Sequence, residues 1–447
     1  MLELFTTGLM SAWLNMAGMQ PSKQSSLQAM TWFGSPAFFL SGAPEPSTAL
    51  TLEQYLGELS KKGWMADSQG IWIQSGPVLL SSNQGTVPLP AASLTKIATS
   101  LASLHTWEHT HRFDTVFSAT GPIKNGVLQG DLVVTGSGDP LFVWEEAIAV
   151  GNALNRMGIK RVTGNLIVKG KFYMNYSRSI AQAGLTLKQG FNSSTWARGY
   201  SYRYYLMPKG TPKPQLAIAG GVKIDSSPSV SFDSQAGGNS KQTLLLRHRS
   251  VTLAQILKEM NVYSNNEIAE MLADLMGGAQ VVRQLAAEAA GVPRSEILLI
   301  NGSGLGVENR ISPRAACAML MAIQRKMQPL GLTIGDLFPV SGHDRVGTMI
   351  RRHMPEATVM KTGTLRNVSA LAGVMPTRDR GLVWFAIVNR GNDIPALRVE
   401  QDKLLQNLIK SWNTKPEATK IVLPTPTSYS DDSRLGADVR NHVLYGG

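Results

Sequence analysis

The feature that most constrains this 447-residue chain is a set of three short motifs that must meet in space to be useful. A serine and a lysine stand three residues apart at Ser93 and Lys96, and Ser264 and Asn266 follow as an S-x-N pair. The third motif is Lys361-Thr362-Gly363-Thr364. Between Lys96 and Ser264 lie 167 residues. A fold that unites the three motifs must therefore bring distant parts of the chain to one place.

The chemistry of a serine nucleophile explains why the first motif pairs these residue types. A serine hydroxyl is a weak nucleophile at neutral pH and needs a base within hydrogen-bond reach. Positions i and i+3 of a helix share a face, so Lys96 can lie beside Ser93. Burial and a second cation, Lys361, would lower the pKa of Lys96 enough for it to accept a proton. We therefore expect Ser93 to be the nucleophile and Lys96 its base.

The third motif suits the binding of a peptide. Lys361 begins a segment typical of a strand, and Gly363 has no side chain that would block a peptide lying along the strand edge. Lys361 can also bind a substrate carboxylate, while Thr362 and Thr364 offer hydroxyl groups. We expect these four residues to bind substrate.

The second motif would complete the catalytic machinery. Ser264 can relay a proton to the leaving group, and Asn266 can hold the amide of the substrate. The backbone amides of Ser93 and Thr364 would form an oxyanion hole. A structural alternative stays open, because Ser264-Asn265-Asn266 could equally cap the helix that follows.

The pattern of apolar residues divides the chain into two intertwined units. Residues 47–112 and 247–412 carry mainly helical patterns and end in two alternating segments, 369–375 and 382–389, that are typical of adjacent antiparallel strands. Residues 113–246 instead alternate short strand-like runs with turn residues, and one clear helix interrupts them. We predict a discontinuous catalytic domain that is interrupted by a β-rich inserted domain.

The two ends differ from the rest of the chain. Residues 1–46 join a fairly apolar N-terminal segment to a linker rich in Ser, Pro, Gly and Ala. The first basic residue is Lys23, so the charged start of a secretory signal is missing, and whether residues 1–20 are cleaved stays open. Residues 413–447 are polar, rich in Pro and Thr, and without periodicity, which predicts a mobile tail.

The three motifs resemble those of penicillin-binding proteins and serine β-lactamases. The long gap after Lys96, filled by a β-rich insert, narrows the resemblance to the class C low-molecular-mass penicillin-binding proteins, the D-alanyl-D-alanine carboxypeptidase/endopeptidase family. Segments 136–140, 301–305 and 342–349 also resemble that family. The family usually has Asp where this chain has Asn301, which leaves the charge role of that position open.

The resemblance implies a mixed α/β fold of the serine penicillin-recognising (β-lactamase/transpeptidase-like) type, in which an antiparallel sheet is flanked by helices. It implies a serine-type D-Ala-D-Ala carboxypeptidase that acts on peptidoglycan stem peptides through an acyl-enzyme on Ser93 and is inhibited covalently by penicillins and other β-lactam antibiotics. The expected location is the cell envelope or periplasm, and no metal or organic cofactor is implied. The family also cleaves D-Ala cross-links as an endopeptidase, and the balance between the two activities stays open.

The net charge of +12 narrows the choice of partners. A basic surplus can indicate nucleic acid, anionic lipid or an acidic polymer such as cell wall. The sequence has no long block of Lys and Arg, so we expect no nucleic-acid partner, whereas peripheral association with membrane or wall fits the charge. The oligomeric state stays open.

Other functions remain to be weighed. A β-lactamase would differ by fast hydrolysis of its acyl-enzyme, and Glu296 resembles the water-activating Glu of class A enzymes, although its spacing to Asn301 is one residue too long. A catalytically weak wall-binding protein, docked through the insert and the positive charge, is a third hypothesis. His105, His109 and His111 have a spacing seen in metal sites but lack further clustered ligands, so we expect no metal.

Overall fold

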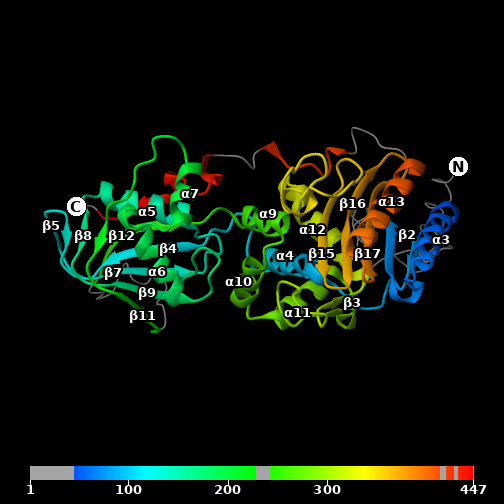
Figure 1. Ribbon diagram of the computed structural model, residues 1–447, viewed down its shortest axis with the longest axis horizontal. Helices are drawn as coiled ribbons and strands as arrows, with labels where there is room; N and C mark the ends of the chain where they lie inside the picture. Colours follow the sequence, from blue (N-terminus) through cyan, green and yellow to red (C-terminus); the bar gives the residue numbers. More distant parts are fainter. Residues whose placement is uncertain (1–44, 228–241, 413–418, 427–430, 446–447) are drawn as a thin grey trace, which may run out of the picture.

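The structure is a computed structural model that describes residues 45–227, 242–412, 419–426 and 431–445. The molecule is elongated, with two units arranged along its long axis (Figure 1). Apart from its last two residues, the N-terminal segment expected over 1–46 lies outside the described residues. No helix in the described ranges is long and apolar enough to cross a membrane.

The first unit is built on a five-stranded sheet in the order β15-β16-β17-β1-β2, antiparallel throughout. Its strands are β1 (Gly70–Ser75), β2 (Val78–Asn83), β15 (Val359–Leu365), β16 (Val368–Thr377) and β17 (Gly381–Arg390). The antiparallel pair predicted at 369–375 and 382–389 is confirmed as β16 and β17. Both strands are almost wholly buried, because helices cover both faces of the sheet.

Helices form a layer on each face of this sheet. One face carries α3 (Pro46–Lys61) and α13 (Ile394–Trp412), whose apolar stripes join a core that includes Leu59, Phe385 and Leu405. The other face carries a larger layer with its own core. Its helices are α4 (Thr95–Thr106), α9 (Leu253–Tyr263), α10 (Asn266–Met276), α11 (Ala279–Ala290) and α12 (Pro313–Met327). A small sheet of β13 (Ile297–Leu298), β14 (Arg310–Ile311) and β3 (Leu89–Pro90) lies at its edge.

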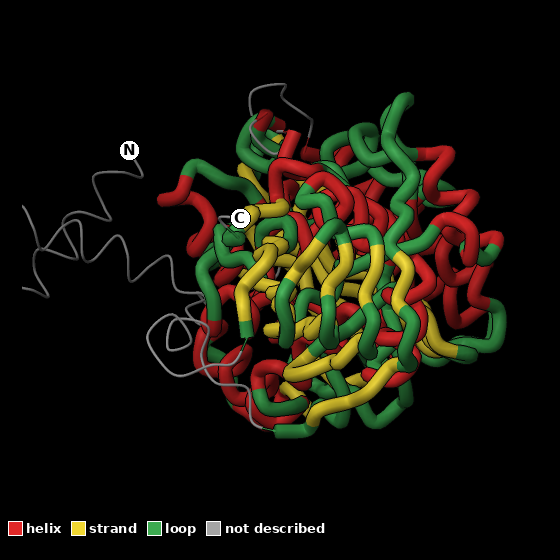
Figure 2. Tube along the Cα trace, turned by 90° about the vertical axis from the view of Figure 1, so that its left-hand side faces the viewer, coloured by secondary structure: helices red, strands yellow, loops and turns green. Residues whose placement is uncertain are grey.

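The second unit is inserted between α4 and α9 and has a separate core. Figure 2, in which this unit faces the viewer, shows its strands side by side. Its six-stranded sheet has the order β11-β9-β7-β4-β12-β18. These strands are β4 (Asp114–Ala119), β7 (Leu132–Ser137), β9 (Leu166–Lys171), β11 (Val222–Asp225), β12 (Thr243–Arg249) and β18 (Asn441–Val443). A four-stranded sheet consists of β5 (Ile123–Lys124), β6 (Val127–Leu128), β8 (Arg161–Val162) and β10 (Ala217–Ile218).

The insert is more helical than its sequence pattern indicates. It contains α5 (Trp144–Arg156), α6 (Ile180–Gly190) and α7 (Arg198–Leu206), where one helix was expected. The reason lies in the sheet, because β7, β9 and β11 are parallel neighbours. Parallel strands need long crossover connections, which are usually helical. The insert is therefore β-rich, but its main sheet is mixed.

The C-terminal segment differs from the mobile tail expected over 413–447 wherever the structure describes it. Thr333 donates a hydrogen bond to the carbonyl of Leu423 at 2.9 Å in the first unit. Farther on, β18 pairs with β12 in the insert, and Arg440 Nη2 lies 2.6 Å from Glu146 Oε1 in a fully buried ion pair. Strand pairing and a buried ion pair need no periodic apolar pattern, so neither could be expected from the pattern of residues 413–447.

Candidate active site

Ser93 lies directly before a buried helix. A short 3₁₀ turn, η2 (Ala92–Leu94), holds Ser93 and leads directly into α4. Ala92 has a φ of +47°, a conformation that costs a non-glycine residue free energy and persists only where its surroundings impose it. Gly304 packs directly against this turn, since a Cβ on that glycine would lie 1.8 Å from the Ala92 carbonyl oxygen. The nucleophile candidate therefore stands on a tightly braced turn.

Lys96 is fully buried beneath Ser93 and makes three contacts. Its Nζ lies 3.0 Å from Ser93 Oγ, 2.7 Å from Asn266 Oδ1 and 2.8 Å from the carbonyl oxygen of Ser303. Burial lowers the pKa of Lys96 to about 7, while the negative charge of Glu270 opposes this change. At neutral pH about half of the Lys96 amines are thus free to accept a proton.

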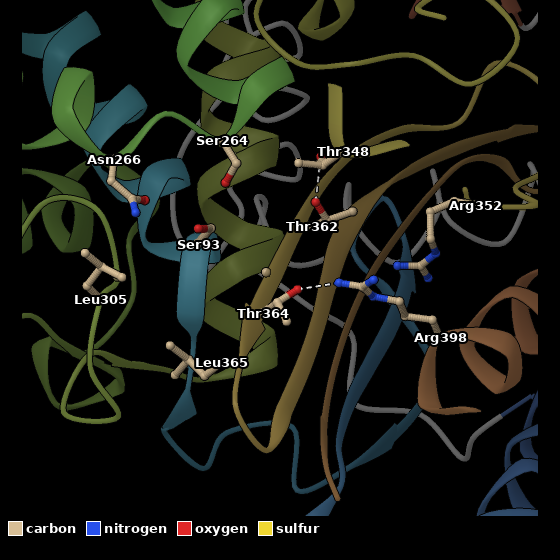
Figure 3. Close-up of a pocket in the computed structure, with 12 residues that line it drawn as sticks. Ser93, Ser264, Asn266, Leu305, Thr348, Arg352, Thr362, Thr364, Leu365 and Arg398 are labelled. Carbon is tan, nitrogen blue, oxygen red and sulfur yellow. Dashed lines mark hydrogen bonds between the residues drawn. The ribbon is translucent and has the colours of Figure 1, made fainter. Parts of the chain in front are cut away.

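The S-x-N motif occupies the junction between α9 and α10. Ser264 ends α9 in the left-handed conformation, with a φ of 54°. Asn265 caps α10, because its side chain accepts a hydrogen bond from the amide of Ile268 at 3.1 Å. The capping alternative is therefore confirmed, and the cap also holds Ser264 and Asn266 on the side of the junction that faces Ser93 (Figure 3).

Lys361 approaches the same space from β15. It is fully buried, and its Nζ donates to Ser264 Oγ at 2.9 Å and to the Thr362 carbonyl at 2.8 Å. Burial first, and repulsion from Lys96 second, lower the pKa of Lys361 well below its usual value. Gly363 allows β15 to pass close to the nucleophile, because a Cβ there would lie 3.0 Å from the backbone nitrogen of Ser93. The structure thus brings all eight expected site residues together.

A pocket of about 240 Å³ opens above these groups. Figure 3 shows it between the end of η2, the α9–α10 junction and the edge of β15. Twelve residues line it: Ser93, Ser264, Asn266, Gly304, Leu305, Thr348, Arg352, Thr362, Gly363, Thr364, Leu365 and Arg398. Its two charged lining residues are arginines, which suits a ligand that carries a carboxylate.

The two arginines differ in their partners. Arg352 is buried and pairs with Asp402 at 2.6 Å. Arg398, on α13, donates from Nη2 to Thr364 Oγ1 at 2.7 Å, and it forms no ion pair with any described residue (Figure 3). The positive charge of Arg398 is therefore available to a ligand at the Thr364 end of the pocket.

Three of the residues around the motifs were missed by the sequence reasoning. Glu270 holds the backbone amide of Ser303 at 2.9 Å, and its position one turn after Asn266 on α10 was a usable signal. Arg352 and Arg398 belong to no motif and lie far from Thr364 in the sequence, so only the fold reveals them.

Residues considered for other roles lie elsewhere. Glu296 does not line the pocket; it accepts a hydrogen bond from Ser312 and pairs with Arg314. His111 packs edge-on against Phe113, with ring centroids 4.8 Å apart. Neither residue takes part in the site.

Comparisons with known proteins identify the family of this chain. The D-Ala-D-Ala carboxypeptidase 3 (S13) family matches residues 59–188 and 218–410. The D-alanyl-D-alanine carboxypeptidase DacB of Haemophilus influenzae is 23% identical, over 74% of this chain and 85% of that protein. A D-alanyl-D-alanine carboxypeptidase of an Actinomadura species is 24% identical, over 89% of this chain and 91% of its own length.

Solved structures show the same fold. The predatory endopeptidase Bd3459 of Bdellovibrio bacteriovorus has a TM-score of 0.66 at 20% identity, over 80% of this chain and 96% of that structure. Penicillin binding protein 4 (dacB) of Haemophilus influenzae has a TM-score of 0.59 at 18% identity, over 80% and 98% of the two chains. The expected serine penicillin-recognising fold is thereby confirmed, and the chain belongs to the D-Ala-D-Ala carboxypeptidase 3 (S13) family.

Proposed function

We propose that this serine-type D-Ala-D-Ala carboxypeptidase cleaves the terminal D-Ala from peptidoglycan stem peptides through an acyl-enzyme on Ser93. The observation that carries the proposal is the contact between Lys96 Nζ and Ser93 Oγ at 3.0 Å, with the pKa of Lys96 lowered to about 7. A buried lysine that is half neutral at physiological pH is a competent general base. The serine beside it opens onto the pocket, where a substrate carbonyl can approach.

Acylation follows from these contacts. Neutral Lys96 takes the proton of Ser93 as Oγ attacks the carbonyl carbon of the penultimate D-Ala. The backbone amides of Ser93 and Thr364 stabilise the negative charge that develops on the carbonyl oxygen. The carbon–nitrogen bond then breaks, and the proton that Lys96 took up passes to the leaving amine through Ser264, whose hydroxyl lies 2.9 Å from Lys361 Nζ. Lys96 is neutral again after this transfer. Free D-Ala departs and an ester on Ser93 remains.

Deacylation returns the enzyme to its starting state. A water molecule attacks the ester carbonyl and gives its proton to Lys96, which passes it back to Ser93 as the ester bond breaks. Asn266 holds the amide of the substrate, and until free D-Ala departs, the hydroxyl of Thr364 and Arg398 bind the carboxylate of that D-Ala. A β-lactam such as benzylpenicillin presents the same carbonyl and carboxylate, so Ser93 is acylated by it.

Cleavage of a D-Ala cross-link uses the same acylation step with a larger leaving amine. The fold is shared with an endopeptidase, Bd3459, which supports this second activity. A dimeric, cross-linked muropeptide tests it directly, because its conversion to monomers requires the endopeptidase reaction.

The substrate places the protein in the cell envelope, in the periplasm where that compartment exists. Its partners are then peptidoglycan stem peptides, with β-lactams as covalent inhibitors. The concentrated positive charge described below supports association with the wall.

The experiment uses intact-protein mass spectrometry after brief exposure to benzylpenicillin, followed by peptide mapping, and D-Ala release from a soluble pentapeptide. We expect a long-lived adduct on Ser93 and D-Ala release in the native protein, and neither in Ser93→Ala. Ser60→Ala, which changes an exposed serine on α3, is the matched control. D-Ala release by Ser93→Ala would refute the mechanism, and rapid hydrolysis of the penicillin would identify a β-lactamase instead.

A further inference from the structure

The net positive charge of this protein can be assigned to one stretch of the insert. Residues 147–224 contain twelve Lys and Arg side chains and neither Asp nor Glu. The chain has 43 Lys and Arg in total, so the other parts hold 31, which equals their 31 Asp and Glu. The whole net charge of +12 therefore belongs to a segment that runs from α5 to β11.

A pocket of about 270 Å³ lies within this segment, at the C-terminal end of α5. Three cations line it, namely Arg156, Lys160 and Lys213. The other lining residues are Asn152, Asn155, Pro212 and Gln215, so no acidic side chain takes part. Amide groups beside several cations form an environment for a carboxylate or another anion attached to a peptide.

The pocket is built from hydrogen bonds that join α5 to residues 212–215. Asn152 Nδ2 donates to the Pro212 carbonyl at 2.7 Å, and Asn155 Oδ1 accepts from the Gln215 amide at 2.7 Å. These bonds hold the two walls in place without using the cations. The arrangement is thus preformed, which lowers the entropic cost of binding a ligand.

Two of the three cations keep their charge for a ligand. Lys160 and Lys213 are exposed and form no ion pair with any described residue, whereas Arg156 pairs with Asp438. Lys213 Nζ lies 5.2 Å from the centre of the Tyr204 ring, a cation–π contact that restricts the lysine. The pocket therefore presents at least two uncompensated positive charges at defined positions.

Exposed tyrosines extend this surface along α7. Tyr202 is 64% exposed and Tyr205 is 79% exposed, and Tyr205 touches Tyr204 with ring centroids 6.0 Å apart. Large aromatic side chains left open to solvent beside cations are typical of binding surfaces. The S13 family match leaves residues 189–217 uncovered, and this gap includes α7 and Lys213. The other two cations of the pocket, Arg156 and Lys160, lie within the matched residues.

We propose that the pocket formed by Arg156, Lys160 and Lys213 is a second peptidoglycan-binding site, which holds a stem peptide other than the one being cleaved through its carboxylates. The inference rests on the proposed function, because the ligand is the polymer that the active site would cleave. Stem peptides repeat along that polymer and carry several carboxylates, which match a concave site of cations and amides. The pocket lies in the unit at the far end of the molecule from β15–β17 (Figure 1), as a polymeric substrate allows.

The test separates binding from catalysis. Binding to purified peptidoglycan sacculi is measured by co-sedimentation with Ser93→Ala as the host, so that no turnover alters the polymer. Lys160→Glu/Lys213→Glu in this host should bind about tenfold more weakly at low ionic strength, because attraction becomes repulsion at two positions. The difference should shrink as salt rises to about 0.5 M. Lys410→Glu/Lys420→Glu, the same charge change at exposed lysines of the other unit, is the matched control.

Pentapeptide cleavage and vesicle binding by the double variants complete the test. In the protein that keeps Ser93, Lys160→Glu/Lys213→Glu should release D-Ala from a soluble pentapeptide at the native rate. This result would also show that the variant is folded. Lys160→Gln/Lys213→Gln removes the two charges without reversing them. Unchanged sacculus binding in both double variants would overturn the proposal. So would a loss confined to vesicles of phosphatidylglycerol, which would identify a membrane surface instead. Loss of pentapeptide cleavage in the native enzyme, with sacculus binding retained, would refute the proposed function alone.

Discussion

The protonation of Lys96 yields a prediction that can be worked out from the structure. Glu270 lies on α10, where its carboxylate accepts hydrogen bonds from the backbone amides of Ser303 at 2.9 Å and Gly302 at 3.4 Å. Its negative charge stabilises protonated Lys96 and so opposes the effect of burial on the pKa. Glu270→Gln removes the charge but keeps an oxygen for the amides. The pKa of Lys96 should then fall below its native value of about 7.

The magnitude follows from the titration of one group. With a pKa of about 7, the neutral fraction of Lys96 rises from roughly one tenth at pH 6 to roughly nine tenths at pH 8. Acylation of Ser93 should therefore accelerate about tenfold across this range. A shift of one pH unit corresponds to about 1.4 kcal/mol of interaction between Glu270 and protonated Lys96. Glu270→Gln should move the midpoint downward by about that amount.

The assay is the rate of acylation by a fluorescent penicillin, measured by stopped flow from about pH 5 to pH 9. Glu267→Gln is the control. It makes the same chemical change on the same helix, but the carboxylate that it removes pairs with Arg178. The control should keep the native midpoint. A native profile that is flat between pH 6 and pH 8, or an upward shift in Glu270→Gln, would refute the assignment of Lys96 as the base.

Two further substitutions test the pocket and the C-terminal segment. Arg398→Ala should raise KM for the pentapeptide about tenfold with a smaller change in kcat, because an uncompensated cation next to Thr364 is lost. Arg398→Lys should recover part of the difference. An unchanged KM would exclude carboxylate binding by Arg398. Arg440→Met should lower the free energy of unfolding by about 3 kcal/mol, because it removes the arginine from a fully buried ion pair with Glu146. Urea denaturation would show no such loss if the C-terminal segment were not docked in solution.

Most of the candidate site was brought together in the prediction because its residues lie in short motifs. Ser93 and Lys96 are close in the sequence, and the need of the serine for a base implied that they touch, as they do at 3.0 Å. The lowered pKa of Lys96 was expected from burial and a neighbouring cation. The structure assigns the effect on Lys96 to burial, whereas repulsion between the two lysines appears in the pKa of Lys361.

Residues that act singly could not be predicted in the same way. Arg398 reaches the site only because α13 packs where it does, and no local pattern marks it. The described part of the C-terminal segment escaped for a related reason. Its polar sequence lacks the apolar stripe that identifies a packed element, yet strand pairing and the Arg440–Glu146 ion pair hold it in place.

The C-terminal segment also bears on the distance between the proposed cationic pocket and Ser93, because it can keep that distance constant. Two connections join the insert to the first unit, one entering it and one leaving it. They are hydrogen-bonded to each other, because the Ser250 amide donates to the Phe113 carbonyl at 2.9 Å and the Leu253 amide donates to the His111 carbonyl at 2.8 Å. The C-terminal segment adds a third link, because it is bound at Thr333 in one unit and at β12 in the other. A two-stranded connection alone would leave hinge motion as the default expectation. Three links restrict that motion, so the cationic pocket and Ser93 would engage stem peptides at a set separation along the polymer.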